Sequence, residues 1–239
     1  MTRLTTCPDA ESAAQRAAQE VLRHLEEARM QGRTPHVALS GGGTPKRTYE
    51  LLAREPEQWA EAEVWFADER CVPPEDEESN YRLAALALLE PAGIPAQRVH
   101  RIEGELGPER GAKRYAQALR VRLDGHPVPV LDLIVLGIGP DGHVASLFPR
   151  APTLQAGEDA VCLPVYDSPK PPPQRITLSL AVLRSARRCL LLATGATKAD
   201  AISAMLAEPM PSVPASLLVR ERLTVIVDDA AAPAGGGPR

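Results

Sequence analysis

The sequence predicts an α/β fold in which a mostly parallel central sheet carries helices on both faces. Short β-type segments alternate with helical periodicity along almost the whole chain, as in βαβ units. The continuous apolar run over residues 131–136 also suits a strand that is buried on both faces, as in the middle of a parallel sheet. We therefore expect helices rather than solvent on both sides of the sheet.

The individual elements follow from periodicity and from residues that begin or end helices. Residues 9–30 place alanines and branched apolar residues on one helical stripe, and Gly32 would end that helix. Ser79 is a candidate N-cap for a helix over 80–89, which Pro91 and Gly93 would end. Further helices are predicted at 45–53, 109–123 and 198–206, and strands at 36–40, 64–67, 131–136, 161–166, 175–178, 188–193, 215–219 and 223–227.

The length allows one large α/β domain or two small ones, and the absence of a long polar linker favours one domain over residues 1–229. The chain has 239 residues, of which 44% are hydrophobic and 24% charged, which is ordinary for a globular protein. The segment 230–239, A-A-A-P-A-G-G-G-P-R, is expected to be disordered. A formal net charge of -4 argues against nucleic acid or an anionic membrane surface as a partner.

The cysteines and the N-terminus predict a reduced cytoplasmic protein. The four cysteines lie far apart and form no C-x-x-C pair, so we expect neither a disulfide framework nor a zinc site. The N-terminus has no apolar stretch of the secretory kind, and no apolar run approaches the roughly 20 residues that span a bilayer.

A glycine turn after the first predicted strand is a candidate anion site. Residues 39–47 read L-S-G-G-G-T-P-K-R, with Thr44 as the expected N-cap and Pro45 in the first helical turn. Free N–H groups and the positive end of the helix dipole favour a phosphate there. The alternative is an ordinary strand-to-helix turn that binds nothing. The segment lacks the G-K-[ST] ending of a nucleoside-triphosphate loop. The candidate binding residues are Ser40, Gly41, Gly42, Gly43, Thr44 and Arg47.

Charged residues follow other predicted strands. Asp68 and Arg70 come just after a strand end, where the arginine could bind a phosphate or carboxylate in bidentate fashion. Arg175 opens a later strand, and Lys198 lies in a glycine turn that starts a helix. Each is a candidate substrate contact, and each alone could equally be a solvated surface charge.

The loop after the strand at 131–136 holds the candidate catalytic residues. It reads G-I-G-P-D-G-H-V-A-S-L-F-P, in which glycines surround Asp141 and His143. A neutral imidazole there could accept a proton near pH 7. The segment also matches the dinucleotide pattern G-x-G-x-x-G, but Pro149 and Pro152 leave room for a helix of only about one turn before Phe148. The alternative is a purely structural histidine.

Together these segments favour a small phosphorylated substrate. One histidine accompanies several glycine or cationic loops, with no thiol or metal cluster. Neither Ser40 nor Ser146 lies in a G-x-S-x-G elbow, which argues against a serine hydrolase. Water would then be the nucleophile, with His143 as its base.

The order of four motifs resembles a known family. S-G-G-G-T-P, D-E-R-x-V-P with S-N downstream, G-x-G-x-D-G-H-x-A-S-L-F-P and S-P-K-P-P-P-x-R-I-T occur in register over residues 21–227. The chain thus resembles the lactonase branch of the glucosamine-6-phosphate isomerase/6-phosphogluconolactonase superfamily. The sibling deaminases share D-G-H but continue with an A-F-N-E-P type sequence, where this chain has A-S-L-F-P over 145–149.

The resemblance implies a Rossmann-like three-layer fold and hydrolysis of 6-phospho-D-glucono-1,5-lactone without a metal or cofactor. It implies that His143 is the general base and that the turn 40–44, with Arg70 and Lys198, holds the phosphate. Asp68 or Asp141 would orient polar partners, and Gly142 and Arg175 are further candidate contacts. Two departures are Gly43, where Ser is common, and Val144, where Thr is common.

Three other functions remain open at this point. They are a glucosamine-6-phosphate deaminase or isomerase, a non-catalytic sugar-phosphate sensor, and a dinucleotide-dependent oxidoreductase. The expected partner is a small sugar-phosphate lactone, with neither nucleic acid nor membrane, and the expected assembly is a monomer or homodimer.

Overall fold

A six-stranded parallel sheet forms the centre of the molecule. A computed structural model describes residues 2–123 and 126–233. The strand order is β1-β9-β8-β5-β2-β3, and every neighbouring pair is parallel. The strands are β1 (Arg3–Cys7), β2 (His36–Leu39), β3 (Glu63–Phe66), β5 (Leu133–Leu136), β8 (Arg188–Ala193) and β9 (Leu223–Asp228). The predicted α/β class with a mostly parallel sheet is confirmed.

The middle of this sheet is apolar on both faces, as the run at 131–136 predicts. All four residues of β5 are buried, and so are the last five residues of β8. β2 joins them, with Val37 opposite both Val64 and Leu133. Because no face of these strands meets water, helices must cover both sides.

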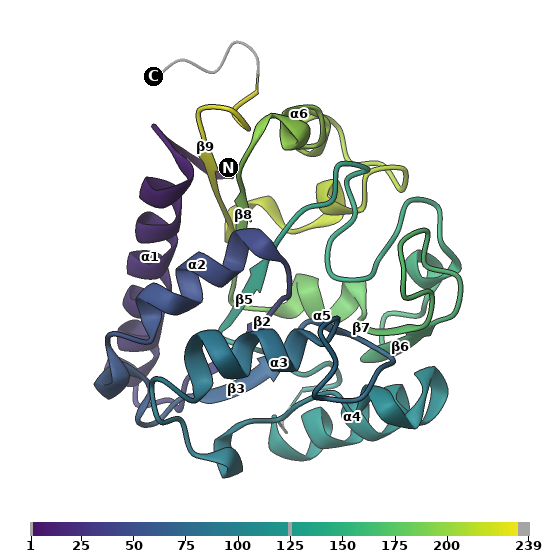
Figure 1. Ribbon diagram of the computed structural model, residues 1–239. Coiled ribbons are helices and arrows are strands. Elements are labelled where there is room, and N and C mark those ends of the chain that lie inside the picture. Colours follow the sequence, from purple (N-terminus) through teal and green to yellow (C-terminus); the bar gives the residue numbers. More distant parts are fainter. Residues whose placement is uncertain (1, 124–125, 234–239) are drawn as a thin grey trace.

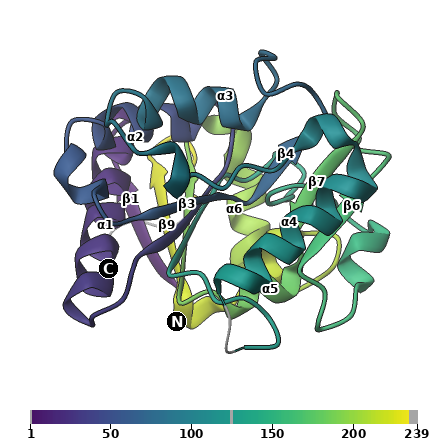
Figure 2. The ribbon, with the colours of Figure 1, turned by 90° about the horizontal axis from the view of Figure 1, so that it is seen from below.

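Helices lie on the two faces of the sheet. They are α1 (Ala10–Met30), α2 (Gly43–Leu52), α3 (Asn80–Ala84), α4 (Pro108–Arg122), α5 (Leu180–Ser185) and α6 (Ala199–Leu206). Figures 1 and 2 place α1, α2 and α3 on one face and α5 and α6 on the other. This is the three-layer arrangement that the resemblance implies.

Local signals explain where the helices begin. Asp9 caps α1 by accepting a hydrogen bond from Ser12 N at 2.7 Å. Ser79 caps α3 by accepting one from Arg82 N at 3.2 Å, as predicted. After Ala84 the predicted helix over 80–89 continues as a π-helical turn, Ala85–Leu89.

A small antiparallel sheet, which the sequence did not predict, lies beside the large one. It contains β4 (Asp68–Arg70), β7 (Arg175–Leu178) and β6 (Cys162–Val165) in the order β4-β7-β6, and α4 packs against it. A single residue, Ala67, connects β3 to β4. Its N–H donates to Leu39 O, and its carbonyl accepts from Leu178 N, each at 2.8 Å. One residue thus ties the two sheets together.

Two further elements differ from the sequence predictions. Residues 215–219 do not form a strand, because Pro214 starts a 3₁₀ turn, Pro214–Leu217, which the Ser216 hydroxyl links to Met210. Strand β1 and helix α5 were not predicted at all. Both are short, and their sequences carry too few periodic residues to signal an element.

Some expectations concern absences or lie outside the described residues. All four cysteines are free thiols. Across residues 2–123 and 126–233, no helix has the length and apolar character needed to cross a bilayer. In the same ranges no group of three or more His, Cys, Asp or Glu could hold a metal ion. The expected disorder of residues 230–239 falls mostly on 234–239, which lie outside the described part.

Candidate active site

The candidate site lies at the carboxyl edge of the parallel sheet. The strands β8, β5, β2 and β3 are neighbours and end at this edge. Their loops, with the small sheet, enclose a cavity of about 270 Å³. The chain leaves β2 toward β3 on one side and returns as β5 on the other, so the cavity lies where ligands collect in open α/β sheets. The charged or polar residues among those that line it are Ser40, Thr44, Asp68, Arg70, Asn80, His143, Lys170, Arg175 and Lys198.

Tyr49 holds the glycine turn by hydrogen bonds, and Asn80 packs closely against it. Tyr49, fully buried on α2, donates to Ser40 O at 2.7 Å and accepts from Ser40 N at 3.1 Å. A Cβ at position 41 would stand 1.7 Å from Asn80 Oδ1, so only glycine fits there. The first N–H groups of α2 have no partner within the helix and are available to an anion.

The N-cap of α2 is not Thr44, and that prediction is wrong. The cap is Gly42, whose φ of 109° is open to glycine, so the helix begins one residue before Thr44. Thr44 lies in the first turn, where its Oγ1 is 3.3 Å from Thr194 Oγ1. This contact joins the glycine turn to the loop after β8.

The histidine loop positions the imidazole against a carboxylate. Nδ1 of His143 is 2.6 Å from Oδ1 of Asp141. Gly139 N donates to His143 O at 2.9 Å, and a Cβ on Gly139 would stand 2.0 Å from His143 Nδ1. The glycine at 139 is therefore required for the ring to lie where it does. Because the carboxylate accepts the Nδ1 proton, the lone pair of the neutral ring is on Nε2.

Asp141 is ionised throughout the neutral range. Burial alone would raise the pKa of this carboxyl, but the hydrogen bond and charge of His143, with the charge of Lys170, lower it to about 2. Asp141 is not part of the cavity wall and acts through the ring that it holds.

The residues after His143 do not start a long helix, in line with the argument against a dinucleotide site, and they form no helical turn either. Instead Val144 bridges Leu147, and Ala145 adopts a φ of 49°, outside the helical region. The segment folds back so that the Phe148 ring lies 4.7 Å from the imidazole, centroid to centroid. The imidazole therefore has a carboxylate on one side and an aromatic ring on another.

A buried network holds Asp68 at the cavity wall. Its Oδ2 accepts from Ser146 Oγ at 2.7 Å, and its Oδ1 accepts from Asn80 Nδ2 at 3.2 Å. Asn80 Nδ2 also donates to Asp68 O at 2.8 Å, which fixes the orientation of the amide. Asn80 Oδ1 must then point away from Asp68, and it has no hydrogen-bond partner in the described part of the chain.

Glu69 fastens the start of α3 beside this network. Its carboxylate is buried and accepts from the N–H groups of Arg70, Asn80 and Tyr81 at 2.7–2.8 Å, and from Ser79 Oγ at 3.1 Å. Burial raises the pKa of this carboxyl. No cation pairs with it among the described residues, so the backbone of α3 supplies its stabilisation.

Two arginines face each other across the small sheet. Arg70 on β4 pairs in register with Arg175 on β7. Like charges directly opposite destabilise an antiparallel pair, so an anion near them would relieve the repulsion. Burial is the main cause that lowers the pKa of Arg175; the charge of Asp68 opposes it and the charge of Arg70 adds to it. Arg70 Nη1 donates to Glu78 O, whereas its buried Nε has no partner in the described ranges.

The remaining predicted residues divide into two groups. Lys198 lines the cavity, and burial lowers its pKa, assisted by the charge of Lys170. Arg47 lies outside the cavity wall and pairs with Glu11 and Glu50. Gly142 is also outside, with a φ of 82° that serves the turn. Two wall residues, Asn80 and Lys170, were not singled out, although both lie in motifs that the resemblance rests on.

The fold and the site define a class of protein. The chain is an α/β protein in which a histidine held by a carboxylate shares one cavity with an uncapped helix start and several cations. The model of the family described as glucosamine-6-phosphate isomerases/6-phosphogluconolactonase matches residues 8–227. The chain belongs to this family.

Known relatives match most of the chain. The human 6-phosphogluconolactonase is 41% identical over 208 residues, which is 82% of this chain and 79% of the relative. That of Streptomyces coelicolor is 36% identical over 94% of this chain and 91% of the relative. The solved structure of 6-phosphogluconolactonase from Trypanosoma cruzi superposes with a TM-score of 0.88 at 26% identity, covering 99% of this chain and 98% of that one.

Proposed function

We propose that this chain hydrolyses 6-phospho-D-glucono-1,5-lactone to 6-phospho-D-gluconate, the lactone step of the oxidative pentose phosphate pathway, with water activated by His143. Relatives called 6-phosphogluconolactonase at 36–41% identity support the reaction. The observation that carries the mechanism is the 2.6 Å contact between His143 Nδ1 and Asp141, which leaves Nε2 to act on the cavity side.

The proposed mechanism needs only protein groups and water. Water attacks the lactone carbonyl while Nε2 of His143 takes its proton, and Asp141 stabilises the imidazolium. The carbonyl oxygen becomes an oxyanion, which N–H groups or a neighbouring cation stabilise. The bond from the carbonyl carbon to the ring oxygen then breaks, and His143 returns the proton to that oxygen. The immediate product is a carboxylic acid and a free hydroxyl, and the acid then loses its proton to the solvent at neutral pH.

Polar atoms that lack partners support binding of a polar ligand in this cavity. In the described part of the chain, buried Ser40 Oγ, Arg70 Nε and Asn80 Oδ1 make no hydrogen bond, and all three residues line the wall. Leaving such atoms unsatisfied costs about 1–3 kcal/mol each. A phosphorylated sugar lactone offers oxygens for Arg70 and hydroxyls for Ser40 and Asn80.

The test is a lactonase assay coupled to 6-phosphogluconate dehydrogenase, corrected for spontaneous opening of the lactone. We expect enzyme-dependent formation of 6-phosphogluconate and no ammonia from glucosamine 6-phosphate. Ammonia release without lactone hydrolysis would assign the chain to the deaminase function instead. Thermal stabilisation by 6-phosphogluconate without any turnover would indicate the sensor.

Two narrower expectations remain predictions. A cytoplasmic location rests on the pattern of free cysteines, and the assembly is expected to be a monomer or homodimer. Fractionation and light scattering, respectively, measure them.

A further inference from the structure

The imidazole of His143 has a different neighbour on each of three sides. Its Nδ1 meets the carboxylate of Asp141 at 2.6 Å. The backbone of Gly139 lies so close to Nδ1 and Cε1 that it leaves no room for a Cβ. Phe148 covers a third side, with its ring plane inclined by 43° to the imidazole. The His143 side chain is only 14% exposed, so these contacts rather than solvent determine its environment.

The segment that carries Phe148 is anchored independently of the imidazole. Before the ring, Ser146 N donates to Thr177 Oγ1 at 3.2 Å, and Ser146 Oγ donates to Asp68 Oδ2 at 2.7 Å. After the ring, Ala151 N donates to Phe148 O at 3.1 Å. Phe148 itself is buried. The position of its ring is therefore fixed by neighbouring segments, and the imidazole packs against a surface that is already in place.

Arg175 holds the Phe148 ring from a further direction. Its guanidinium lies over that ring, 5.6 Å from the centroid, and a cation is attracted to the negative face of an aromatic ring. Arg175 is fixed in turn by the proline loop, residues 171–173, which has no N–H groups of its own. The Nε and Nη2 of Arg175 donate to the carbonyls of residues 170–172, each at 3.1 Å.

The imidazole contacts a single carboxylate. Within residues 2–123 and 126–233 that carboxylate is Asp141. The charged residues of the cavity wall are Asp68, Arg70, Lys170, Arg175 and Lys198. Among them only Asp68 is an anion, and its oxygens accept hydrogen bonds from Ser146 and Asn80. The side of the imidazole that Phe148 covers therefore carries no negative charge.

The number of carboxylates beside the imidazole decides whether it can act as a base. One carboxylate fixes the tautomer and stabilises the imidazolium that forms when water loses its proton. A second would stabilise the imidazolium before any substrate reacts, and an imidazolium has no lone pair to accept a proton. The sibling motif A-F-N-E-P places a glutamate at the position where this chain has Phe148.

We propose that Phe148 is a positioning residue that keeps His143 available as a base, because its ring fixes the imidazole and occupies the side on which a second carboxylate would hold it protonated. This inference rests on the proposed function and names the position that adapts the histidine to lactone hydrolysis. Phe148 is not part of the cavity wall, so it acts through the imidazole and not by contact with the substrate.

The first experiment compares Phe148→Glu with Phe148→Gln, two side chains of the same shape that differ in charge. Arg175 should remain bound to the proline loop in both. We expect the acidic limb of the pH profile of kcat/KM for 6-phospho-D-glucono-1,5-lactone to lie roughly 1–3 pH units higher in Phe148→Glu. Val121→Glu and Val121→Gln, at a position on α4 that is 73% exposed, are the matched controls and should have coincident profiles. Coincident profiles for the two variants at position 148 would overturn the proposal.

A third variant, Phe148→Leu, tests the positioning alone. It keeps an apolar side chain but removes the flat ring against which the imidazole packs. We expect kcat to fall about 3- to 10-fold, with KM and the pH profile close to those of the wild-type chain. An unchanged kcat, or a loss confined to KM, would show that the ring does not position the base.

A spectroscopic readout does not depend on turnover. Nitrogen NMR shifts of the His143 ring, assigned by their absence from His143→Ala, should show a neutral ring with its proton on Nδ1 in the wild-type chain at pH 7. Phe148→Glu should keep the imidazolium to a higher pH than Phe148→Gln. An imidazolium in the wild-type chain at pH 7 would overturn the proposal.

These spectra also separate this inference from the proposed function. If the wild-type chain hydrolysed no lactone, the proposed function would fail, and the spectra of the two variants alone would decide the role of Phe148. If Phe148→Glu did not fold, the wild-type spectrum and the kinetics of Phe148→Leu would decide it.

Discussion

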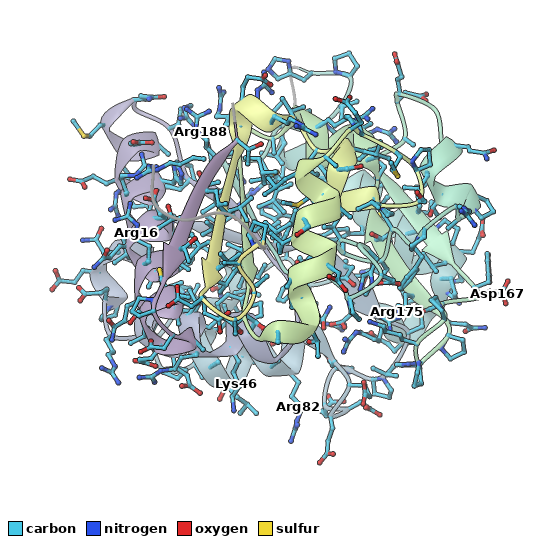
Figure 3. The ribbon with its side chains drawn as sticks, turned by 90° about the horizontal axis from the view of Figure 1, so that it is seen from above. Arg16, Lys46, Arg82, Asp167, Arg175 and Arg188 are labelled. Atoms are coloured by element: carbon cyan, nitrogen blue, oxygen red, sulfur yellow. The ribbon has the colours of Figure 1, made fainter. Side chains whose placement is uncertain are left out.

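The two ends of the parallel sheet differ in whether their positively charged side chains pair with carboxylates. At the amino end, Arg33 and Arg187 both contact the buried carboxylate of Asp132, and Arg122 contacts Glu63. At the carboxyl end, Lys170 and Lys198 have no carboxylate partner in the described ranges, and Arg175 donates only to carbonyls. Figure 3 shows Arg188, at the start of β8, and Arg175 on opposite sides of the molecule.

The difference separates structural charges from functional ones. A cation whose partner is a buried carboxylate is already neutralised by the fold, and its removal affects stability. A cation beside a cavity without such a partner can be neutralised by a ligand. We therefore expect substitutions at the carboxyl end to change activity and substitutions at the amino end to change stability.

The largest expected effect is at His143. His143→Ala removes the proposed base, and kcat should fall about 10²- to 10⁴-fold, the usual contribution of general base catalysis. The coupled lactonase assay measures this change. Binding of 6-phosphogluconate and the melting temperature should stay close to those of the wild-type chain. Near-complete retention of kcat would place the base elsewhere.

Asp141→Asn should have the next largest effect. The carboxylate accepts the Nδ1 proton, and without it the ring can carry its proton on Nε2, where it cannot act as a base. We expect kcat to fall about 10²-fold, less than or equal to the loss in His143→Ala, because the two residues act as one unit. Additive losses in the double variant would contradict the pairing.

At the amino end, His36 should make stability depend on pH. Burial, with the nearby charges of His100 and Arg122, outweighs the charge of Glu63 and lowers the pKa of His36 from 6.5 to about 4. In the unfolded chain His36 becomes protonated below about pH 6.5, whereas in the folded chain it becomes protonated only near pH 4. The free energy of unfolding therefore decreases as the pH falls from 6.5 to about 4. The loss from this residue is at most about 3 kcal/mol at pH 4.

Urea unfolding at pH 7 and pH 4.5 measures this dependence, with His36→Gln as the comparison. The variant should lose less stability on acidification than the wild-type chain. Trp65 Nε1 donates to His36 Nδ1 at 3.1 Å, so the variant needs an acceptor, which glutamine supplies. An identical pH dependence in both proteins would show that His36 is not the titrating group.

Asp132→Asn should have a smaller effect, again on stability alone. Asp132 accepts from His36 N at 2.9 Å and contacts Arg33 and Arg187. Loss of its charge should lower the free energy of unfolding by about 1–3 kcal/mol. The kinetic constants of the lactonase reaction should not change. A changed KM would mean that the two ends of the sheet are coupled, against the comparison above.

The sequence predicts those parts of the site that lie within one local segment. His143 and Asp141 are both candidates because they lie two residues apart in a glycine-rich loop, but the sequence leaves open whether Asp68 or Asp141 orients its polar partners, and the 2.6 Å contact with His143 belongs to Asp141. The positions of Asn80 and Lys170 depend on pairing between distant segments. Asn80 reaches the cavity because Glu69 draws the start of α3 toward β4, and Lys170 because Arg175 supports a proline loop.

Elements of the fold, too, were predictable only where the local sequence determines them. Strands 175–178 and 188–193 were predicted with correct bounds because their apolar residues are continuous or alternate clearly. Strand β4 is the charged segment D-E-R, which no propensity favours, and it is extended because β7 pairs with it. After His143 the sequence limits any helix to about one turn, but it does not reveal the positive φ of Ala145 that folds the segment back.

The hydrogen bonds of Ala67 limit the length of the substrate that can react in the cavity. Hydrogen bonds on both sides of this residue keep the small sheet, with Arg70 and the proline loop beside Arg175, at a constant spacing from the imidazole on the large sheet. Such a cavity selects ligands by the distance between their phosphate and their carbonyl carbon. We therefore expect a phosphorylated lactone one carbon shorter to be a poorer substrate, because its carbonyl would lie farther from His143 with the phosphate bound at the same place.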